Sequence, residues 1–420
     1  MQRRHTLFSP RLTTLLLGVS ALALVFGIIR FPAQAFQASI QGLHLWWKLV
    51  FPTLLPFLIL TELLRGLGLL HGLGALLEPL LRMLFRLPGI GGWILALGYT
   101  TGPQSGAAAI GALRKEGAIT REEGERLLSA SHVFNPIFII GVVGVGFLQN
   151  ATAGLALAVI HYASAILLML LHRIGAESAQ VPFAPRNFAD DAASGWLSRS
   201  TQMMRTAKNR DGRTFGKLLG DSVAAGTEQL FIIGGCMMIF SVMMQMITLT
   251  HFSTAVAAIF SIFGFRPVGT ASVFTALLTG VLEPNLGTYA IAGSHYIPES
   301  AQSALLSLLI AWGGLSTHAQ IKSFVAATDL RFSRFMLSRL QHGVIAFLLS
   351  LISWKPLMAM LSQGSDQPVL AGYAAANSTW ALEKDSLWPL ISPMMLQFGT
   401  TILILLILSV FAAFLLNRKP

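Results

Sequence analysis

Gly98-Tyr-Thr-Thr-Gly-Pro-Gln-Ser-Gly106 and Gly280-Val-Leu-Glu-Pro-Asn-Leu-Gly287 interrupt two apolar segments of this chain in the same way. Each stretch brings glycine, proline and polar side chains into a segment where a lipid-facing helix would avoid them. Backbone groups without helical partners are costly in hydrocarbon unless protein or trapped water satisfies them. Paired breaks of this kind in corresponding halves of a chain are typical of the midplane binding site of a secondary transporter. The two stretches therefore predict a membrane transporter.

The composition of the 420 residues supports a membrane protein. Hydrophobic residues make up 54% of the chain and charged residues 11%, whereas charged residues make up about 25% of soluble domains. The net charge is +11, but the basic residues lie mainly in loops and tails between apolar segments. The positive-inside rule accounts for this distribution, so we expect no nucleic-acid partner.

Several kinds of chemistry are excluded by the residues that the sequence lacks. The single cysteine, Cys236, excludes an internal disulfide and a cysteine-based metal cluster, and we expect a buried apolar side chain there. No metal-ligand spacing is found, and phosphate-loop, dinucleotide and hydrolase motifs are missing. We therefore expect neither an enzyme nor a bound metal or cofactor.

The apolar segments predict an all-α, polytopic membrane protein. The predicted spans are residues 12–29, 43–64, 129–148, 151–171, 229–249, 303–325, 335–353 and 396–416, with interfacial helices at 66–87 and 252–265. In the first interfacial helix, Glu78 and Arg82 are four residues apart and so share one helical face. Thr120, three residues before Glu123, predicts a capping box at a helix start. The two interrupted segments predict short re-entrant helical hairpins.

We divide the chain into five parts. These are residues 1–42, an N-terminal transmembrane span; 43–172, a first repeat with a re-entrant hairpin at 89–113; 173–228, a basic cytoplasmic linker; 229–354, a second repeat with a hairpin at 268–292; and 355–420, an external loop and C-terminal span. Residues 173–217 of the linker hold eight basic and four acidic side chains. We expect a solvated cytoplasmic loop there, and contact with the membrane surface is the alternative.

An offset of 181 residues aligns the two halves. It places Pro103 on Pro284 and Gly106 on Gly287, and His161 precedes its closing span as His342 does. Weak internal symmetry of this kind is typical of transporter repeats. With a cytoplasmic N-terminus, every basic loop falls on one side and the hairpins enter from opposite faces. The sequence therefore predicts two inverted repeats with broken transmembrane helices and both termini in the cytoplasm.

Glu283 is the acidic residue in the second break, and no other lies between Glu228 and Glu299. An intramembrane carboxylate is costly and is a functional candidate for that reason. It could bind a coupling cation, carry a proton or accept a hydrogen bond from the substrate. The structural alternative is a carboxylate that pairs with an arginine or with backbone amides to hold the hairpin tip.

The other breaks supply neutral polar groups and glycines. Helix amino ends present free N–H groups and a positive dipole end, which suit a carboxylate or phosphate, although single hydroxyls often bond only to their own helix. Polar clusters at 131–136 and 312–320 break two further spans, and the roles of His132 and His318 within them stay open. The predicted substrate-binding residues are Thr101, Gly102, Gln104, Ser105, Gly106, Asn135, Glu283, Asn285, Thr288, Ser316, Thr317 and Gln320.

Four motifs make the chain similar to a known family. Leu87-Pro-Gly-Ile-Gly-Gly-Trp93, Arg114-Lys-Glu-Gly117, Thr120-Arg-Glu-Glu-Gly-Glu-Arg-Leu-Leu128 and Trp312-Gly-Gly-Leu-Ser-Thr-His-Ala-Gln320 resemble the YlbJ/SpoVV sporulation integral membrane proteins, over about residues 43 to 353. That family carries nucleoside-recognition gate repeats similar to those of concentrative nucleoside transporters, in which hairpins and broken helices of two inverted repeats enclose the substrate.

The resemblance implies transport of dipicolinate, a small aromatic dicarboxylate, across the outer forespore membrane during sporulation. The expected partners are this small anion, the lipid bilayer, a coupling cation or proton, and further copies of the chain. Two alternatives stay open. One is transport of a nucleoside or another small metabolite, and the other is a scaffold for spore-envelope (cortex) assembly that transports nothing.

Overall fold

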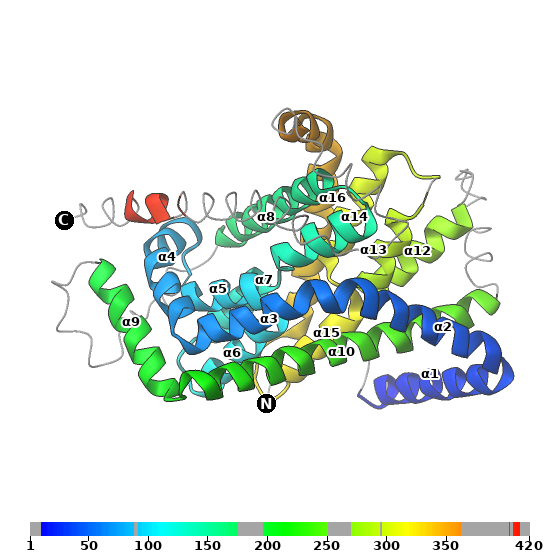
Figure 1. Ribbon diagram of the computed structural model, residues 1–420, viewed down its shortest axis with the longest axis horizontal. Helices are drawn as coiled ribbons and strands as arrows, with labels where there is room; N and C mark the ends of the chain where they lie inside the picture. Colours follow the sequence, from blue (N-terminus) through cyan, green and yellow to red (C-terminus); the bar gives the residue numbers. More distant parts are fainter. Residues whose placement is uncertain are drawn as a thin grey trace.

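The computed structural model describes residues 10–87, 91–174, 196–250, 270–294, 296–362, 403 and 406–411 (Figure 1). These residues form helices and short connections, and the described part of the chain contains no strand. The prediction of an all-α protein is confirmed. The second predicted interfacial helix (252–265), the external loop beyond residue 362 and most of the last predicted span (396–416) lie outside the described residues.

Among the described residues, five helical stretches are long and apolar enough to cross a membrane. They are Pro32–Gly66, Ala151–Arg173, Phe215–Leu249, Glu299–Val325 and Phe332–Ser362. The first contains α2 (Pro32–Leu45), a π-helical turn (Trp46–Val50) and α3 (Phe51–Gly66); the second is α8, the third α10 and the fifth α16. At 1.5 Å per residue, about 20 helical residues cover the hydrocarbon core, so each stretch is long enough to span it.

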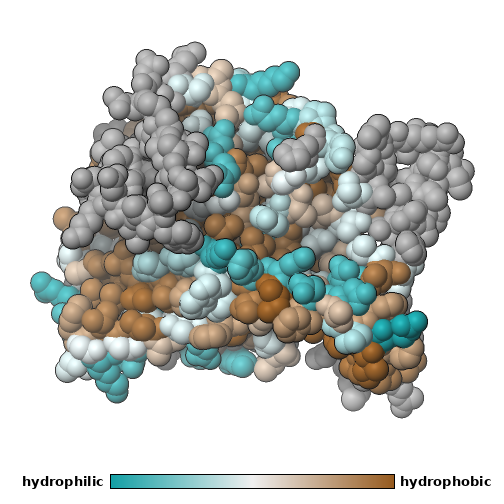
Figure 2. Space-filling model, turned by 45° about the vertical axis from the view of Figure 1, so that its right-hand side comes forward, coloured by the Kyte–Doolittle hydropathy of each residue, from teal (hydrophilic) through white to brown (hydrophobic). Residues whose placement is uncertain are grey.

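Large apolar side chains are exposed on the outer helices. Phe26 on α1 (Pro10–Arg30), Phe36 on α2 and Phe231 on α10 are all more than half exposed, and broad apolar areas cover the face shown in Figure 2. Soluble monomers rarely expose contiguous apolar surface of this extent. A bilayer around these helices would remove the surface from water, as expected for an integral, multi-pass protein.

Each of the two predicted breaks separates a pair of short helices that pack against each other. α5 (Gly91–Thr101) is followed by α6 (Pro103–Lys115), and α12 (Thr270–Leu282) is followed by α13 (Pro284–Ala292). A proline occupies the first position of α6 and of α13, where its missing N–H would have no helical partner anyway. The chain therefore stops one helix and starts the next within two residues.

Two longer segments are also interrupted, where the polar clusters predicted it. α7 (Arg121–Ser131) ends before Pro136 and a π-helical segment (Ile137–Phe147) follows, while α14 (Glu299–Trp312) gives way to α15 (Gly314–Val325). Proline disfavours helix in the residue before it. Gly313 and Gly314 have φ values of 86° and 75°, which glycine adopts without strain. The predicted spans 129–148 and 303–325 are therefore each made of two helical pieces.

Part of the predicted linker is a packed helix, so the prediction of a solvated loop is wrong there. α9 (Trp196–Asp211) packs against α4 (Leu69–Phe85). Arg199 Nη2 lies 2.9 Å from Glu78 Oε2, and the predicted ion pair of Glu78 with Arg82 forms at 2.7 Å. Because Arg199 of α9 finds a carboxylate partner on α4, this segment gains contacts that composition does not reveal.

The predicted end of one helix was too early, whereas the predicted start of another was correct. α16 continues nine residues past the predicted end of its span at residue 353, because Trp354 is buried and donates a hydrogen bond to Glu299 Oε1 at 3.1 Å. The predicted capping box of Thr120 and Glu123 is confirmed at the start of α7.

Helix ends recur at a spacing of 181 residues. α5 ends at Thr101 and α12 at Leu282, and α7 ends at Ser131 and α14 at Trp312. α8 begins at Ala151 and α16 at Phe332, again 181 residues later. In space, α10 lies beside α2 and α3, and α16 lies beside α8 and α14 (Figure 1).

Candidate functional site

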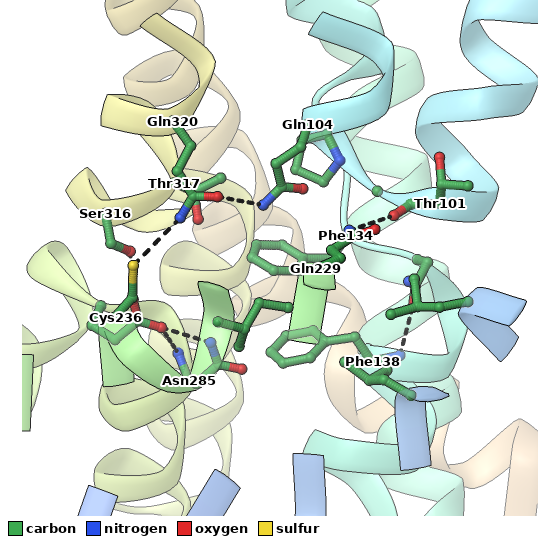
Figure 3. A pocket seen from close by; sticks show the side chains of 17 residues that line it. Thr101, Gln104, Phe134, Phe138, Gln229, Cys236, Asn285, Ser316, Thr317 and Gln320 are labelled. Carbon is green, nitrogen blue, oxygen red and sulfur yellow. Dashed lines mark hydrogen bonds between the residues drawn. The ribbon is translucent and has the colours of Figure 1, made fainter. Parts of the chain in front are cut away.

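A small cavity lies where the helix breaks meet (Figure 3). Its lining residues come from α3, the α5–α6 break, the segment after α7, α10, the α12–α13 break and α15. They are Leu54, Leu58, Thr101, Gly102, Pro103, Gln104, Phe134, Asn135, Phe138, Gln229, Ile233, Cys236, Glu283, Asn285, Ser316, Thr317 and Gln320. The cavity volume is about 50 Å³, enough for a few water molecules.

The lining combines neutral amides with an apolar wall. Five side-chain amides face this space together with the hydroxyls of Ser316 and Thr317, and aromatic and aliphatic side chains including Phe134 and Phe138 complete the wall. Among the lining residues, Glu283 is the one acidic side chain and none is basic. Convergent polar groups on a mostly apolar wall are typical of sites for small molecules.

Glu283 stands at the amino end of α13 and accepts hydrogen bonds on both carboxylate oxygens. The backbone N–H of Asn285 donates to Oε1 at 3.1 Å, and Asn285 Nδ2 donates to the same oxygen at 2.6 Å. Ser316 Oγ donates to Oε2. The side chain is 2% exposed. The carboxylate therefore caps α13 and ties it to α15, and no described residue forms an ion pair with it.

A chain of amide hydrogen bonds crosses the cavity between the halves of the protein. Gln104 Nε2 on α6 donates to Gln320 Oε1 on α15 at 3.2 Å, and Gln320 Nε2 lies 3.6 Å from Cys236 Sγ on α10 (Figure 3). Gln229 Nε2 on α10 donates to the carbonyl of Thr101 at 3.3 Å. These bonds use the side-chain groups that a polar substrate would otherwise contact.

Nine of the twelve predicted site residues line the cavity. They are Thr101, Gly102, Gln104, Asn135, Glu283, Asn285, Ser316, Thr317 and Gln320. The carbonyl oxygen of the Asn135 side chain accepts the N–H of Phe138 at 2.8 Å and so starts the next helical segment, while Thr101 Oγ1 donates to Leu97 O in its own helix at 2.6 Å. Part of the polar capacity of these two residues is therefore used within the backbone.

The other three predicted residues are not among the lining residues. Thr288 is fully buried and its hydroxyl donates to Pro284 O at 2.6 Å, within its own helix. Gly106 packs against α7, where a Cβ atom would lie 2.9 Å from Ser131 Oγ. Ser105 lies one residue beyond Gln104 in the first turn of α6 and is partly buried. The structure thus separates packing positions from cavity positions within each break.

Sequence reasoning missed several lining residues. Gln229 opens an apolar span, a polar position that could have indicated a site, and Phe134 and Phe138 flank the predicted Asn135. Cys236 was expected to be a buried apolar side chain, but it is only partly buried and lies against Gln320. Nothing in the local pattern distinguishes it from other small residues of the same helix.

A buried group of four histidines and Arg339 lies next to the carboxyl end of α7. Arg339 on α16 is fully buried and donates to the carbonyls of Ser129 at 2.6 Å and His132 at 2.5 Å, at the carboxyl end of α7. Its charge therefore complements the helix dipole. The ring centroids of His132 and His318 are 5.6 Å apart, and those of His161 and His342 are 5.0 Å apart. Within the described residues, no group of three or more His, Cys, Asp or Glu side chains is arranged to hold a metal ion.

Ion pairs outside the predicted spans join the first half to the second. Arg331, after α15, lies 2.7 Å from Glu125 on α7, and Arg114 on α6 lies 2.8 Å from Asp329. Burial raises the pKa of Glu125, but hydrogen bonds and charge from Arg331, together with Arg121, outweigh this and hold its pKa below the usual value. The two halves are thus held together at this end of the molecule by charged contacts.

The chain is similar to a sporulation integral membrane protein. It is 34% identical over 362 residues to the sporulation integral membrane protein YlbJ of Bacillus subtilis (strain 168), and the match covers 83% of this chain and 84% of that protein. No protein-family model matches the chain. The match spans both helix breaks, because residues outside it make up less than a fifth of the chain and each break lies farther than that from either end.

Proposed function

This chain belongs to the family of the sporulation integral membrane protein YlbJ, and from that premise we propose that it transports a small organic anion. The anion that we propose is dipicolinate, and the membrane is the outer forespore membrane during sporulation. The sporulation family and the chemistry of the cavity both support this proposal.

The observation that carries the proposal is the open amino end of α6 at the cavity wall. Gly102, Pro103 and Gln104 line the cavity, and no side chain caps this helix. Free N–H groups and the positive dipole end at such a position favour a carboxylate. At the corresponding position of the second break, the amino end of α13 is capped by the carboxylate of Glu283. At one of the two breaks, therefore, a carboxylate already occupies the amino end of the following helix.

The rest of the lining supports a flat, aromatic substrate. Phe134 and Phe138 stack with ring centroids 4.6 Å apart and form part of the wall, so an aromatic ring would find a flat apolar surface beside them. The amides of Gln104 and Gln320 supply donors for carboxylate oxygens once their mutual hydrogen bond opens. A cavity of about 50 Å³ is too small for an aromatic dicarboxylate. We therefore infer that the described conformation is closed and that substrate entry separates the helices.

We infer further that α5–α6 and α12–α13 are re-entrant hairpins of two inverted repeats. The helix ends that recur 181 residues apart support this, as does a contact between His161 and His342, which share that spacing. The Nε2 atom of His342 lies 3.3 Å from His161 O. Equivalent residues of two repeats touch each other near the axis that relates them. The distribution of Lys and Arg supports opposite orientations and cytoplasmic termini.

Reconstitution tests the proposed function directly. Purified protein in liposomes is expected to take up labelled dipicolinate faster than protein-free liposomes, and excess unlabelled dipicolinate should compete. Gln104→Leu is expected to slow uptake, because it removes a donor from the cavity. Wild-type protein that neither binds nor moves dipicolinate would overturn the proposal.

A nucleoside is the second candidate substrate, because neutral amides and stacked phenylalanines also suit a nucleobase. Competition by uridine or adenosine, with none by dipicolinate, would favour it. Protein that binds none of these ligands, and whose cellular role survives changes to the cavity, would instead favour the scaffold.

A further inference from the structure

Glu283 and Ser316 form a hydrogen-bonded pair in the wall of the cavity. Ser316 Oγ donates to Glu283 Oε2, and both residues line the cavity. Oε1 is engaged separately, by the backbone N–H and the side-chain amide of Asn285. The partners of Oε1 can only donate. The partner of Oε2 is the Ser316 hydroxyl, which can either donate or accept a hydrogen bond.

The charge of Glu283 conflicts with an anionic substrate in the same cavity. The lining holds no basic side chain, so no full positive charge there offsets a second negative charge, and the amino end of α6 supplies only a partial one. Two like charges at one site disfavour each other's ionised form. The carboxylate and the substrate anion can share the cavity if one of them takes up a proton.

The other titratable groups near Glu283 are neutral or face elsewhere. On α10, the Cys236 thiol lines the same cavity and contacts Gln320. On α15, His318 Nε2 lies 2.7 Å from Trp312 O, and His132 packs behind Gly313. Arg339 on α16 is engaged with carbonyls of α7. The side chains that α6 and α13 contribute to the cavity, Gln104 and Asn285, are neutral amides.

We propose that Glu283 takes up one proton when the anion binds, and that Ser316 reverses its hydrogen bond in response. A proton from the aqueous phase forms an O–H bond at Oε2, and the carboxyl group becomes neutral. Oε2–H then donates to Ser316 Oγ, so the Ser316 hydroxyl hydrogen is free to turn into the cavity and donate to the anion. The anion therefore gains a donor in the step that removes the opposing charge. This inference rests on the proposed function, since it requires an anionic substrate.

A proton explains this environment better than a coupling metal cation. The three described partners of the carboxylate are an N–H, an amide NH₂ and a hydroxyl, and a cation would have to displace these donors. The described residues bring no second carboxylate beside Glu283 and include no three-residue metal-ligand group.

The pH dependence of dipicolinate binding tests the inference. Between about pH 6 and pH 8 ordinary carboxylic acids stay ionised, so the charge of the free ligand is constant. Wild-type affinity is expected to fall with rising pH, by up to about tenfold per unit when one proton is linked to binding. Glu283→Gln, which is neutral at every pH, is expected to bind with a flat pH profile. Glu299→Gln, a matched change outside the cavity lining, should keep the wild-type slope.

Three outcomes overturn the inference. They are a flat wild-type profile, a wild-type slope in Glu283→Gln, and Ser316→Ala protein that binds as tightly as the wild type at low pH. If wild-type protein binds no dipicolinate at any pH, the proposed function fails instead, so the two failures are distinguishable.

A second measurement needs no variant and covers the case in which Glu283→Gln does not fold. When dipicolinate is added to wild-type protein in weakly buffered solution, about one proton should be taken up per anion bound. Binding without proton uptake would overturn the inference.

Discussion

The two helix breaks share a backbone plan and differ in the group at the amino end of the second helix. In the first, Gly102 precedes Pro103 and no side chain caps α6. In the second, Glu283 precedes Pro284 and its own carboxylate caps α13. One break has therefore satisfied its amino end internally, and the other has left it open at the wall of the cavity. We therefore expect the first break to bind the anion and the second break to supply the group that titrates.

The backbone reinforces this difference. Gly102 has φ of 99°, in the region that favours glycine, whereas Glu283 has φ of −136°, which any residue can adopt. The second break can therefore carry a functional side chain at the turn, and the first cannot without strain. For this reason the first break offers backbone groups and the second offers a carboxylate.

The largest predicted effect compares two corresponding glycines, Gly287, which packs against α12, and Gly106, which packs against α7. A Cβ atom on Gly287 would lie 2.0 Å from the Cα of Gly280, a backbone atom, whereas one on Gly106 would meet the side chain of Ser131 at 2.9 Å. Gly287→Ala is expected to destabilise the protein by about 3 kcal/mol or more, and Gly106→Ala by about 1–2 kcal/mol. Thermal unfolding in detergent measures both. Equal losses would contradict the tighter packing assigned to Gly287.

The next effect concerns the cap of α13. Glu283→Ala removes the acceptor of Asn285 N–H and of Ser316 Oγ and is expected to cost about 1–3 kcal/mol of stability. Gly102→Ala in the first break loses no side-chain cap, but it places a Cβ at φ of 99° and is expected to cost about 1–2 kcal/mol. Denaturation of the two variants in parallel measures the two losses of stability. Addition of free acetate distinguishes them further, because only the Glu283→Ala variant has a vacated carboxylate site to refill.

A smaller effect, on binding alone, is expected at the first break. Gln104→Leu should weaken dipicolinate binding about tenfold, the loss of one hydrogen bond to a charged group, while stability changes little. Calorimetric titration gives the affinity. Thr288→Val in the second helix pair is the control, since that hydroxyl bonds to its own helix and is not among the lining residues. A greater loss of affinity in Thr288→Val than in Gln104→Leu would reverse the roles assigned to the two breaks.

The smallest effect concerns the charged contact between Glu125 on α7 and Arg331, which joins the first half of the chain to the second. The pKa of Glu125 is held below its usual value by Arg331 and Arg121 despite burial. A lowered folded-state pKa stabilises the protein above the unfolded-state pKa, and this contribution is lost as the pH falls through the folded value. Arg331→Ala should therefore lower stability by about 1 kcal/mol at neutral pH and by less in acid. An unchanged difference between wild type and variant as the pH falls would contradict this assignment.

The sequence predicted the breaks because glycine, proline and polar residues are expensive in hydrocarbon and so stand out there. It located Glu283, Gln104 and the polar cluster around Ser316 for the same reason. It did not predict that Thr288 and Gly106 lie outside the cavity lining, since the side-chain direction within a helix depends on how the helices pack. α9 was missed because the ion pair of Arg199 with Glu78 joins residues 121 positions apart, beyond any local pattern.

The most direct test of the central claim is a structure of the protein with dipicolinate bound. We predict the anion in the cavity between the breaks, with one carboxylate at the amino end of α6 beside Gln104 and its ring against Phe134 and Phe138. Density for dipicolinate at another place in the protein, or a carboxylate that contacts Glu283 while the end of α6 stays empty, would contradict the account.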